Sequence, residues 1–245
     1  MKELFTFLLT QPIFNGFVGL YNIIPDVGVV IILITIIMKF ALLPTNTKAI
    51  QAQKSLTELQ PKLDELKKKQ KGDQQAVAQE TMKLYKEHKV NPFGSCLPLL
   101  IQLPIFLALY WVLRDALNPA QDFHMLYSFV SRPESINPLF FGLLDLEKPQ
   151  FVLGALAAAA QYYQAKMFTK KRAPTVAGTG GADENMAAMM NKQMTVMMPI
   201  LTLIIGFSLP GGLLLYWFIS TLFTLVQQII VFKKHDDVKE GKLLN

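Results

Sequence analysis

A single lysine lies inside the first long apolar run of the chain. Lys39 interrupts the run from Val27 to Leu43, five residues before Pro44. A charge in a membrane span costs at least about 2.5 kcal/mol, so its presence needs a reason. One interpretation is that the flexible side chain reaches the water beyond the helix end. The other is that it faces a polar cavity between helices, and Thr35, one turn earlier on the same face, favours this.

Other apolar runs also carry polar side chains. The last run has a polar stripe at spacings of three to four residues, which puts its members on one helix face beside Trp217. The stripe consists of Tyr216, Ser220, Thr224 and Gln227 or Gln228. Gln102, Gln161 and Gln164 add amides in two more runs. Hydrogen bonds between helices explain any one of these residues, but the set together with Lys39 favours a hydrated groove.

The apolar runs, of which the second extends from Leu97 to Leu113, contain no Asp or Glu, which argues against a proton-coupled carrier. The sequence has no GxxxxGK[ST], HExxH or GxSxG motif, so it offers no nucleotide site, zinc-protease site or hydrolase nucleophile of those kinds. The polar connections hold the histidines, and Ser208 and Ser220 have no base beside them in the runs. We therefore expect no enzyme activity, no cofactor and no metal.

Methionines cluster before and within the fourth apolar run. Their flexible thioethers fill gaps in helix packing, and they also suit surfaces that accept varied apolar partners. On the second interpretation they would contact helices of other membrane proteins. The candidate contacts are Met190, Met194, Met197 and Met198.

Composition indicates a membrane protein. The chain has 245 residues, of which 51% are hydrophobic and 17% charged, against about 25% charged in soluble domains. Runs of roughly 17–25 apolar residues are long enough to cross a bilayer. We predict an all-α polytopic membrane protein with five transmembrane helices around a hydrophilic groove. The expected spans are residues 27–44, 93–115, 150–168, 193–209 and 212–232.

The connections differ in character. Residues 1–26 predict an amphipathic helix at the membrane interface, with a sixth span as the alternative. Residues 45–92 predict a charged helical hairpin that breaks near Gly72. Residues 116–149 predict an irregular cap with one short helix. Residues 169–192 are rich in Gly, Ala and Thr and predict a flexible linker, and residues 233–245 form a polar tail.

The basic residues are distributed unevenly across the predicted membrane. Of the 24 Lys and Arg residues, nineteen fall in the hairpin, the linker region and the tail, four fall on the other side, and Lys39 lies between. The positive-inside rule then predicts a cytoplasmic hairpin and C-terminus and an N-terminus outside. Opposite termini require an odd number of spans. The net charge of +6 thus follows membrane topology, and we expect no DNA binding.

Three motifs resemble one known family, the YidC membrane protein insertases. The stretch from Asn91 to Phe106, NPFGSCLPLLIQLPIF, is similar to the family's second span. The stretch from Thr35 to Pro44 resembles its first span, and that from Pro210 to Gln228 resembles its fifth. The resemblance extends from about Asn15 to Lys234.

The resemblance implies five core spans around a groove that opens to the cytoplasm and to lipid, in a short form without a large extracytoplasmic domain. It implies groove positions at Gln102, Gln161 and Trp217, and a groove charge at Lys39, where the family usually has arginine. Lysine keeps the charge but loses the bidentate fork.

The function implied is insertion of nascent membrane proteins into the bacterial plasma membrane without nucleotide hydrolysis. Candidate partners are nascent membrane proteins and the lipid bilayer, and further the Sec translocon, the ribosome and the signal recognition particle receptor. A small-molecule transporter and a passive assembly factor are the alternatives. Transporters often have internal repeats, and the sequence has no convincing one.

Overall fold

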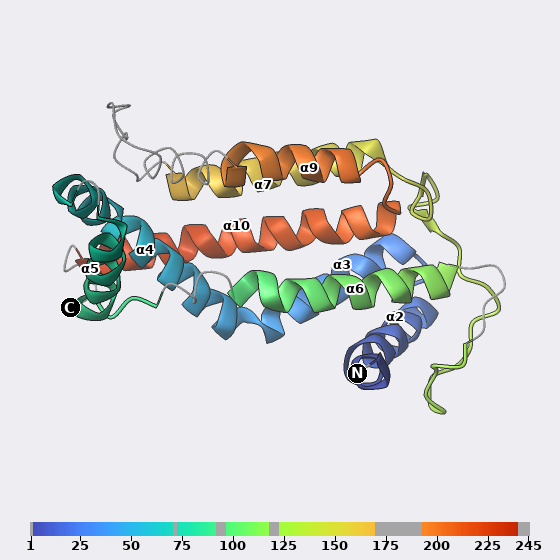
Figure 1. Ribbon diagram of the computed structural model, residues 1–245. Coiled ribbons are helices and arrows are strands. Elements are labelled where there is room, and N and C mark those ends of the chain that lie inside the picture. Colours follow the sequence, from blue (N-terminus) through green and yellow to red (C-terminus); the bar gives the residue numbers. More distant parts are fainter. Residues whose placement is uncertain (1, 71–72, 92–96, 118–122, 170–192, 240–245) are drawn as a thin grey trace. The chain divides into compact units, whose positions relative to one another are not determined.

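The computed structural model describes residues 2–70, 73–91, 97–117, 123–169 and 193–239. Within these residues the chain consists of helices, one short β-hairpin and connecting loops (Figure 1). The chain divides into two compact units. The first comprises Met1–Leu42, Leu99–Gln161 and Met198–Phe223, and the second comprises Leu43–Pro98, Tyr162–Met197 and Thr224–Asn245.

One helical segment begins the chain, made of α1 (Lys2–Phe5), the π-helical η1 (Thr6–Thr10) and α2 (Gln11–Ile23). It ends at Ile23 because Ile24, the residue before Pro25, is extended. In Figure 1, α2 is seen nearly along its axis, whereas α6 of the same unit lies across the view. By length and composition Glu3–Ile23 could also cross a membrane, so its place at the interface stays a prediction.

The helix α3 (Val27–Ala41) carries Lys39. Asp26 caps it by accepting a hydrogen bond from the Val29 backbone N–H at 3.0 Å. The sequence predicts a first span that continues to Pro44, but α3 ends at Ala41 and α4 begins at Leu43. Pro44 accounts for the difference, because it has no N–H with which to continue α3 but fits the first turn of α4.

The core of the first unit lies where α3, α6 (Leu97–Leu117) and the first part of α10 (Gly211–Lys239) meet. Leu109, Leu213 and Leu214 are fully buried there. A Cβ atom on Gly212 would lie 3.0 Å from Ile31 Cδ1 and 3.1 Å from Leu113 Cδ1. Glycine at this position therefore lets the start of α10 approach both neighbouring helices.

A second close approach joins α7 (Phe151–Thr169) to α9 (Met198–Ile205), which follows the π-helical η3 (Gln193–Met197). A Cβ atom on Gly206, just after α9, would lie 3.3 Å from Gly154 Cα. Small residues allow membrane helices to pack backbone against backbone. In this case they bring the polar residues of the two helices within reach of each other.

The connection between α6 and α7 differs from the prediction. Residues 123–150 contain no helix, so the expected short helix is absent from the described part of this connection. The connection instead contains a two-stranded antiparallel hairpin of β1 (Leu139–Phe140) and β2 (Leu144–Asp145). Asn15 of α2 anchors the preceding loop, because its amide donates to the Met125 carbonyl at 2.8 Å and accepts from the Tyr127 N–H at 2.6 Å.

The second unit contains α4 (Leu43–Lys69) and α5 (Gln74–Glu87). Asp73 caps α5 by accepting a hydrogen bond from the Ala76 N–H at 3.0 Å. Leu59 and Leu63 of α4 are buried. The later part of α10 also belongs to this unit, and the helix continues to Lys239, seven residues beyond the predicted end of the fifth span.

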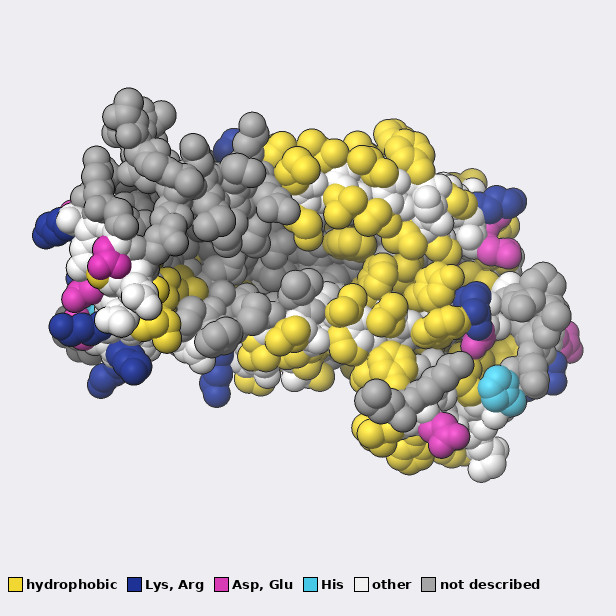
Figure 2. All heavy atoms as spheres, in the orientation of Figure 1, with side chains coloured by type: hydrophobic (Ala, Val, Ile, Leu, Met, Phe, Trp, Pro, Cys, Tyr) yellow, Lys and Arg dark blue, Asp and Glu magenta, His cyan; other side chains and the backbone are white. Residues whose placement is uncertain are grey.

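Hydrophobic side chains dominate the face of the first unit that Figure 2 presents along α6, α7 and α9. By length and composition, three of the described helices can span a membrane: Glu3–Ile23, Leu100–Leu117 and Gly211–Lys233. A fourth is added if α3 and the start of α4 form one broken span. The chain is thus a mainly helical polytopic membrane protein, and the number of five spans stays a prediction.

Candidate functional site

Lys39 lies on the buried face of α3. Its residue is 7% exposed, and Thr35 on the same face is also buried. Ile37 and Phe40 are instead 59% and 60% exposed, as expected for the lipid-facing side. The burial of Lys39 supports the interpretation of a polar interior over that of a side chain reaching out to water.

Thr35 is not a free hydroxyl. Its Oγ1 donates to the Ile31 carbonyl one turn earlier, at 2.6 Å. Serine and threonine in membrane helices often satisfy themselves in this way. Thr35 therefore adds a polar oxygen near Lys39 at little cost to the helix.

A polar pair joins α6 to α10. The Gln102 amide donates to the Tyr216 hydroxyl, and Ser220, one turn further along α10, also hydrogen-bonds that hydroxyl. Tyr216 and Ser220 are both buried. The sequence predicts all three as groove residues, and the structure brings them into direct contact.

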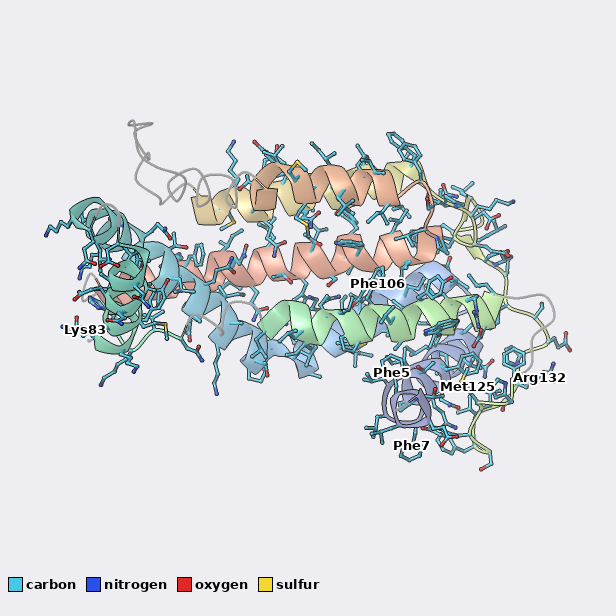
Figure 3. The ribbon with its side chains drawn as sticks, viewed as in Figure 1. Phe5, Phe7, Lys83, Phe106, Met125 and Arg132 are labelled. Carbon is cyan, nitrogen blue, oxygen red and sulfur yellow. The ribbon has the colours of Figure 1, made fainter. Side chains whose placement is uncertain are left out.

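Aromatic rings lie beside this pair. The Phe106 ring packs edge-on against Trp217, with 5.4 Å between the ring centroids, and lies 6.5 Å from the Tyr216 ring. Figure 3 labels Phe106, whose side chain leaves α6 on the side that faces α10. Trp217 is half-buried, so one part of its indole is packed and the other part is accessible.

A second polar pair joins α7 to α9. Thr202 Oγ1 donates to Gln161 Oε1 at 2.6 Å and also lies 3.0 Å from the Met198 carbonyl oxygen. Gln161 is among the groove residues predicted from the sequence, but Thr202, which is buried, is not. The sequence does distinguish Thr202, because it is the only polar residue between Pro199 and Ile205.

The remaining predicted residues are less closely associated. Thr224 follows Ser220 by one turn on α10 but belongs to the second unit. Met197 and Met198 are exposed. Met190 lies outside the described residues, as does the side chain of Met194.

The described part of the site has hydrogen-bonding groups and a lysine but no arrangement of side chains for bond-making chemistry. The described residues contain no group of three or more His, Cys, Asp or Glu that could hold a metal ion. The pairs found are amide with hydroxyl, which bind polar groups but supply neither a nucleophile with a base nor paired acids. Such an arrangement can solvate a polar chain inside an apolar surround.

Comparisons with known proteins decide the family. Residues 19–239 match the family model described as 60Kd inner membrane protein. The chain belongs to this family. It is 35% identical to the membrane protein insertase YidC of Fusobacterium nucleatum over 96% of both chains. It is 38% identical to that of Clostridium tetani over 87% of this chain and 86% of the relative.

Longer members of the YidC family contain the same region. The insertase of Mannheimia succiniciproducens is 34% identical over 92% of this chain, which is 37% of that relative. Among solved structures, an active YidC insertase with its first transmembrane domain resolved matches with a TM-score of 0.58 and 27% identity. The match covers 88% of this chain and 45% of that one. The family resemblance and the all-helical membrane class expected from the sequence are thus confirmed.

Proposed function

We propose that this chain is a membrane protein insertase that moves hydrophilic segments of nascent membrane proteins through a polar groove and releases their apolar helices into lipid. The observation that carries the proposal is the burial of Lys39 inside an apolar helix, in the same unit as the Gln102–Tyr216 and Gln161–Thr202 pairs. Relatives of nearly the same length carry the name membrane protein insertase.

The groove would lower the barrier for a polar segment. A buried amide or hydroxyl without a hydrogen-bond partner costs a few kcal/mol. The amides of Gln102 and Gln161, and the hydroxyls of Tyr216, Ser220 and Thr224, would exchange their present partners for groups of the substrate. Lys39 would attract acidic residues of the translocated segment.

Release of the substrate's own helix would provide the driving force. Burial of apolar surface contributes about 25 cal/mol per Å², and no nucleotide is required. The exposed Met197 and Met198, with Met190 and Met194, would contact that helix, because methionine adapts to partners of different shape. Trp217 would border the groove.

The proposed topology places five spans in the bacterial plasma membrane, with the N-terminus outside and the hairpin and C-terminus in the cytoplasm. The uneven distribution of lysine and arginine supports it. The groove would then receive substrate from the cytoplasm, where nascent chains emerge. The Sec translocon, the ribosome and the signal recognition particle receptor are proposed as further partners.

Reconstitution tests this function. The purified protein in liposomes, without nucleotide, is given a single-span substrate with an acidic N-terminal tail, and protease protection of the tail is measured. We expect protection that protein-free liposomes do not give. Absence of protection for every substrate tried would favour a passive assembly factor, and flux of small solutes without any peptide would favour a transporter.

Crosslinking locates the path. A photoreactive residue at Gln102 or Trp217 should crosslink to a stalled nascent chain, whereas one at the exposed Met82 of α5 should not. Equal crosslinking from these positions would contradict the proposed groove.

A further inference from the structure

The tip of the β1–β2 hairpin exposes large apolar side chains. Phe141 is 70% exposed and Leu143 is 88% exposed. The Leu143 N–H donates to the Phe140 carbonyl at 3.0 Å and closes the turn. The two side chains are therefore presented by a hydrogen-bonded turn and not by a loose loop.

The backbone at the tip is strained. Phe141 has φ 50° and Gly142 has φ 71°. Glycine adopts this left-handed region freely, but a bulky aromatic residue there is an outlier. Such strain persists where the surroundings impose it, and it tends to mark functional positions.

Two contacts at the start of α3 hold this part of the hairpin in place. The Asp26 carboxylate, which caps α3, accepts a second hydrogen bond from the Phe141 N–H at 2.7 Å. The Phe140 ring packs on Gly28 so closely that a Cβ atom at Gly28 would collide with it. The two phenylalanine rings are stacked, with 4.4 Å between their centroids. The fold thus holds the Phe141 ring outward from a fixed base.

The hairpin is tied to the ends of the membrane helices. The Gly211 and Gly212 N–H groups at the start of α10 donate to the Lys148 and Leu146 carbonyls, each at 2.9 Å. Asp26 joins the hairpin to the start of α3, and α7 begins at Phe151. In Figure 1 this yellow-green segment passes the ends of these helices. The hairpin therefore lies level with the residues at which α3, α7 and α10 begin.

Exposed apolar surface continues from this level along the helices. Phe151 and Val152 at the start of α7 are exposed, as is Phe207 after α9. The rings of Phe151 and Phe207 stack at 5.2 Å. Asp145 and Lys148 form an ion pair of 2.8 Å beside the hairpin. Apolar rings with charges alongside suit the membrane–water interface, where side chains bury their apolar part and keep polar groups wet.

We propose that the β1–β2 tip is a membrane anchor that inserts Phe141 and Leu143 into the interfacial layer of the bilayer. Its partner is the lipid surface itself. The anchor would fix the height and tilt of α3 in the bilayer through Asp26, and with them the depth of Lys39.

Fluorescence in liposomes tests the anchor. In a Cys96→Ser background, Leu143→Cys carries an environment-sensitive dye, because Leu143 is exposed and lies outside the strained positions. The matched control is Glu134→Cys, an exposed position in the same connection. Vesicles contain this protein alone, without substrate, so the result is independent of insertase activity.

We expect the dye at residue 143 to be quenched by a nitroxide attached near the lipid headgroup, and to be quenched by aqueous iodide at least about threefold less than the dye at residue 134. Equal iodide quenching at both positions would overturn the proposal. Protection from iodide without quenching by the lipid nitroxide would also overturn it, because protein and not lipid would then cover the tip.

Discussion

Two lysines are buried among the residues whose side chains the structure describes, and they differ in what surrounds them. Lys54 of α4 is 2% exposed. Its Nζ donates to the Phe232 carbonyl of α10 at 3.1 Å and lies 5.1 Å from the centroid of the Phe232 ring. Lys39 is buried within an apolar helix, on the face that carries Thr35. Lys54 thus joins two helices of the second unit, whereas Lys39 lies within the apolar helix α3 of the first.

This difference teaches that burial alone does not identify a functional charge. A buried lysine that holds two helices together contributes to stability. A buried lysine that meets substrate contributes to activity, at a cost to the membrane segment that carries it. The two roles can be separated by mutation. Substitution of Lys54 should alter unfolding, whereas substitution of Lys39 should alter insertion.

The largest expected effect is on activity at Lys39. Lys39→Ala should reduce insertion of a substrate with an acidic translocated tail by at least about tenfold, which corresponds to about 1.4 kcal/mol of lost attraction. Its thermal unfolding should change less than its activity, because the substitution also removes the cost of taking an ammonium group out of water. Protease protection and a thermal melt measure the two properties.

Lys39→Arg is the matched control and should insert this substrate nearly as well as the parent, because the charge is kept. An alanine variant that is as active as the arginine variant would remove the distinction between the two lysines.

The next effect is on stability at Lys54. Lys54→Met keeps the length of the side chain but removes a hydrogen bond from a charged donor, which is worth about 1.5–3 kcal/mol. We expect a lower unfolding temperature and faster hydrogen exchange in α4 and the end of α10. Lys48→Met, at an exposed position of α4, should change neither. If the two variants melt alike, the structural role of Lys54 is wrong.

A smaller effect is expected at the Gln161–Thr202 pair. Thr202→Val removes the hydrogen bond between helices and should cost about 0.6 kcal/mol, measured by denaturant unfolding in detergent. Thr221→Val is the control, because Thr221 Oγ1 donates to the Trp217 carbonyl of its own helix at 2.8 Å. Equal losses in both variants would mean that the contact between helices contributes nothing beyond the bond to the backbone.

The smallest effect concerns the ion pair between Asp145 and Lys148, because the lysine of this pair is exposed to water. The hydrogen bond from Lys148 holds the pKa of Asp145 below its ordinary 3.8, and Asp145 raises the pKa of Lys148 above 10.5. Stabilisation by the carboxylate is therefore full above pH 3.8 and lost as the pH falls through the lowered folded pKa. Stabilisation by the ammonium group of Lys148 is full below pH 10.5 and is lost as the pH rises through the raised pKa of Lys148 in the folded protein.

Lys148→Met should consequently lower the unfolding temperature slightly at neutral pH, and the difference from the parent should vanish in strong acid. High salt should reduce it as well, because exposed pairs are screened. A difference that persists in acid would exclude the ion pair as its cause.

The sequence selects several polar residues that the structure shows to be buried or paired, because they stand out against apolar runs. Lys39, Gln102, Gln161 and Tyr216 are all predicted without coordinates, and their role in a groove stays a prediction. The pairing of Gln102 with Tyr216 is not, since it depends on how α6 and α10 are rotated toward each other. Thr202 could have been selected as the only polar residue between Pro199 and Ile205, but its pairing with Gln161 likewise depends on how two helices pack.

Two further features could not be predicted from local patterns. Lys54 lies in a charged segment, so its local sequence predicts a solvated lysine. In the structure it is buried together with Asn46, Ile50 and Thr57, which lie on the same face of α4 at helical spacing. The β-hairpin has strands of two residues each, which is too short for a periodic signal. Its position depends on Asp26, more than a hundred residues earlier in the chain.

The most direct test of the central claim is a charge exchange between protein and substrate. Lys39→Glu is reconstituted with two substrates that differ only in the sign of the charge on the translocated tail, and protease protection is measured for each. The attraction role predicts that the parent favours the acidic tail and that the variant favours the basic one. If Lys39→Glu inserts the acidic tail as well as the parent does, or impairs both tails equally, Lys39 does not act by attracting the substrate's charge.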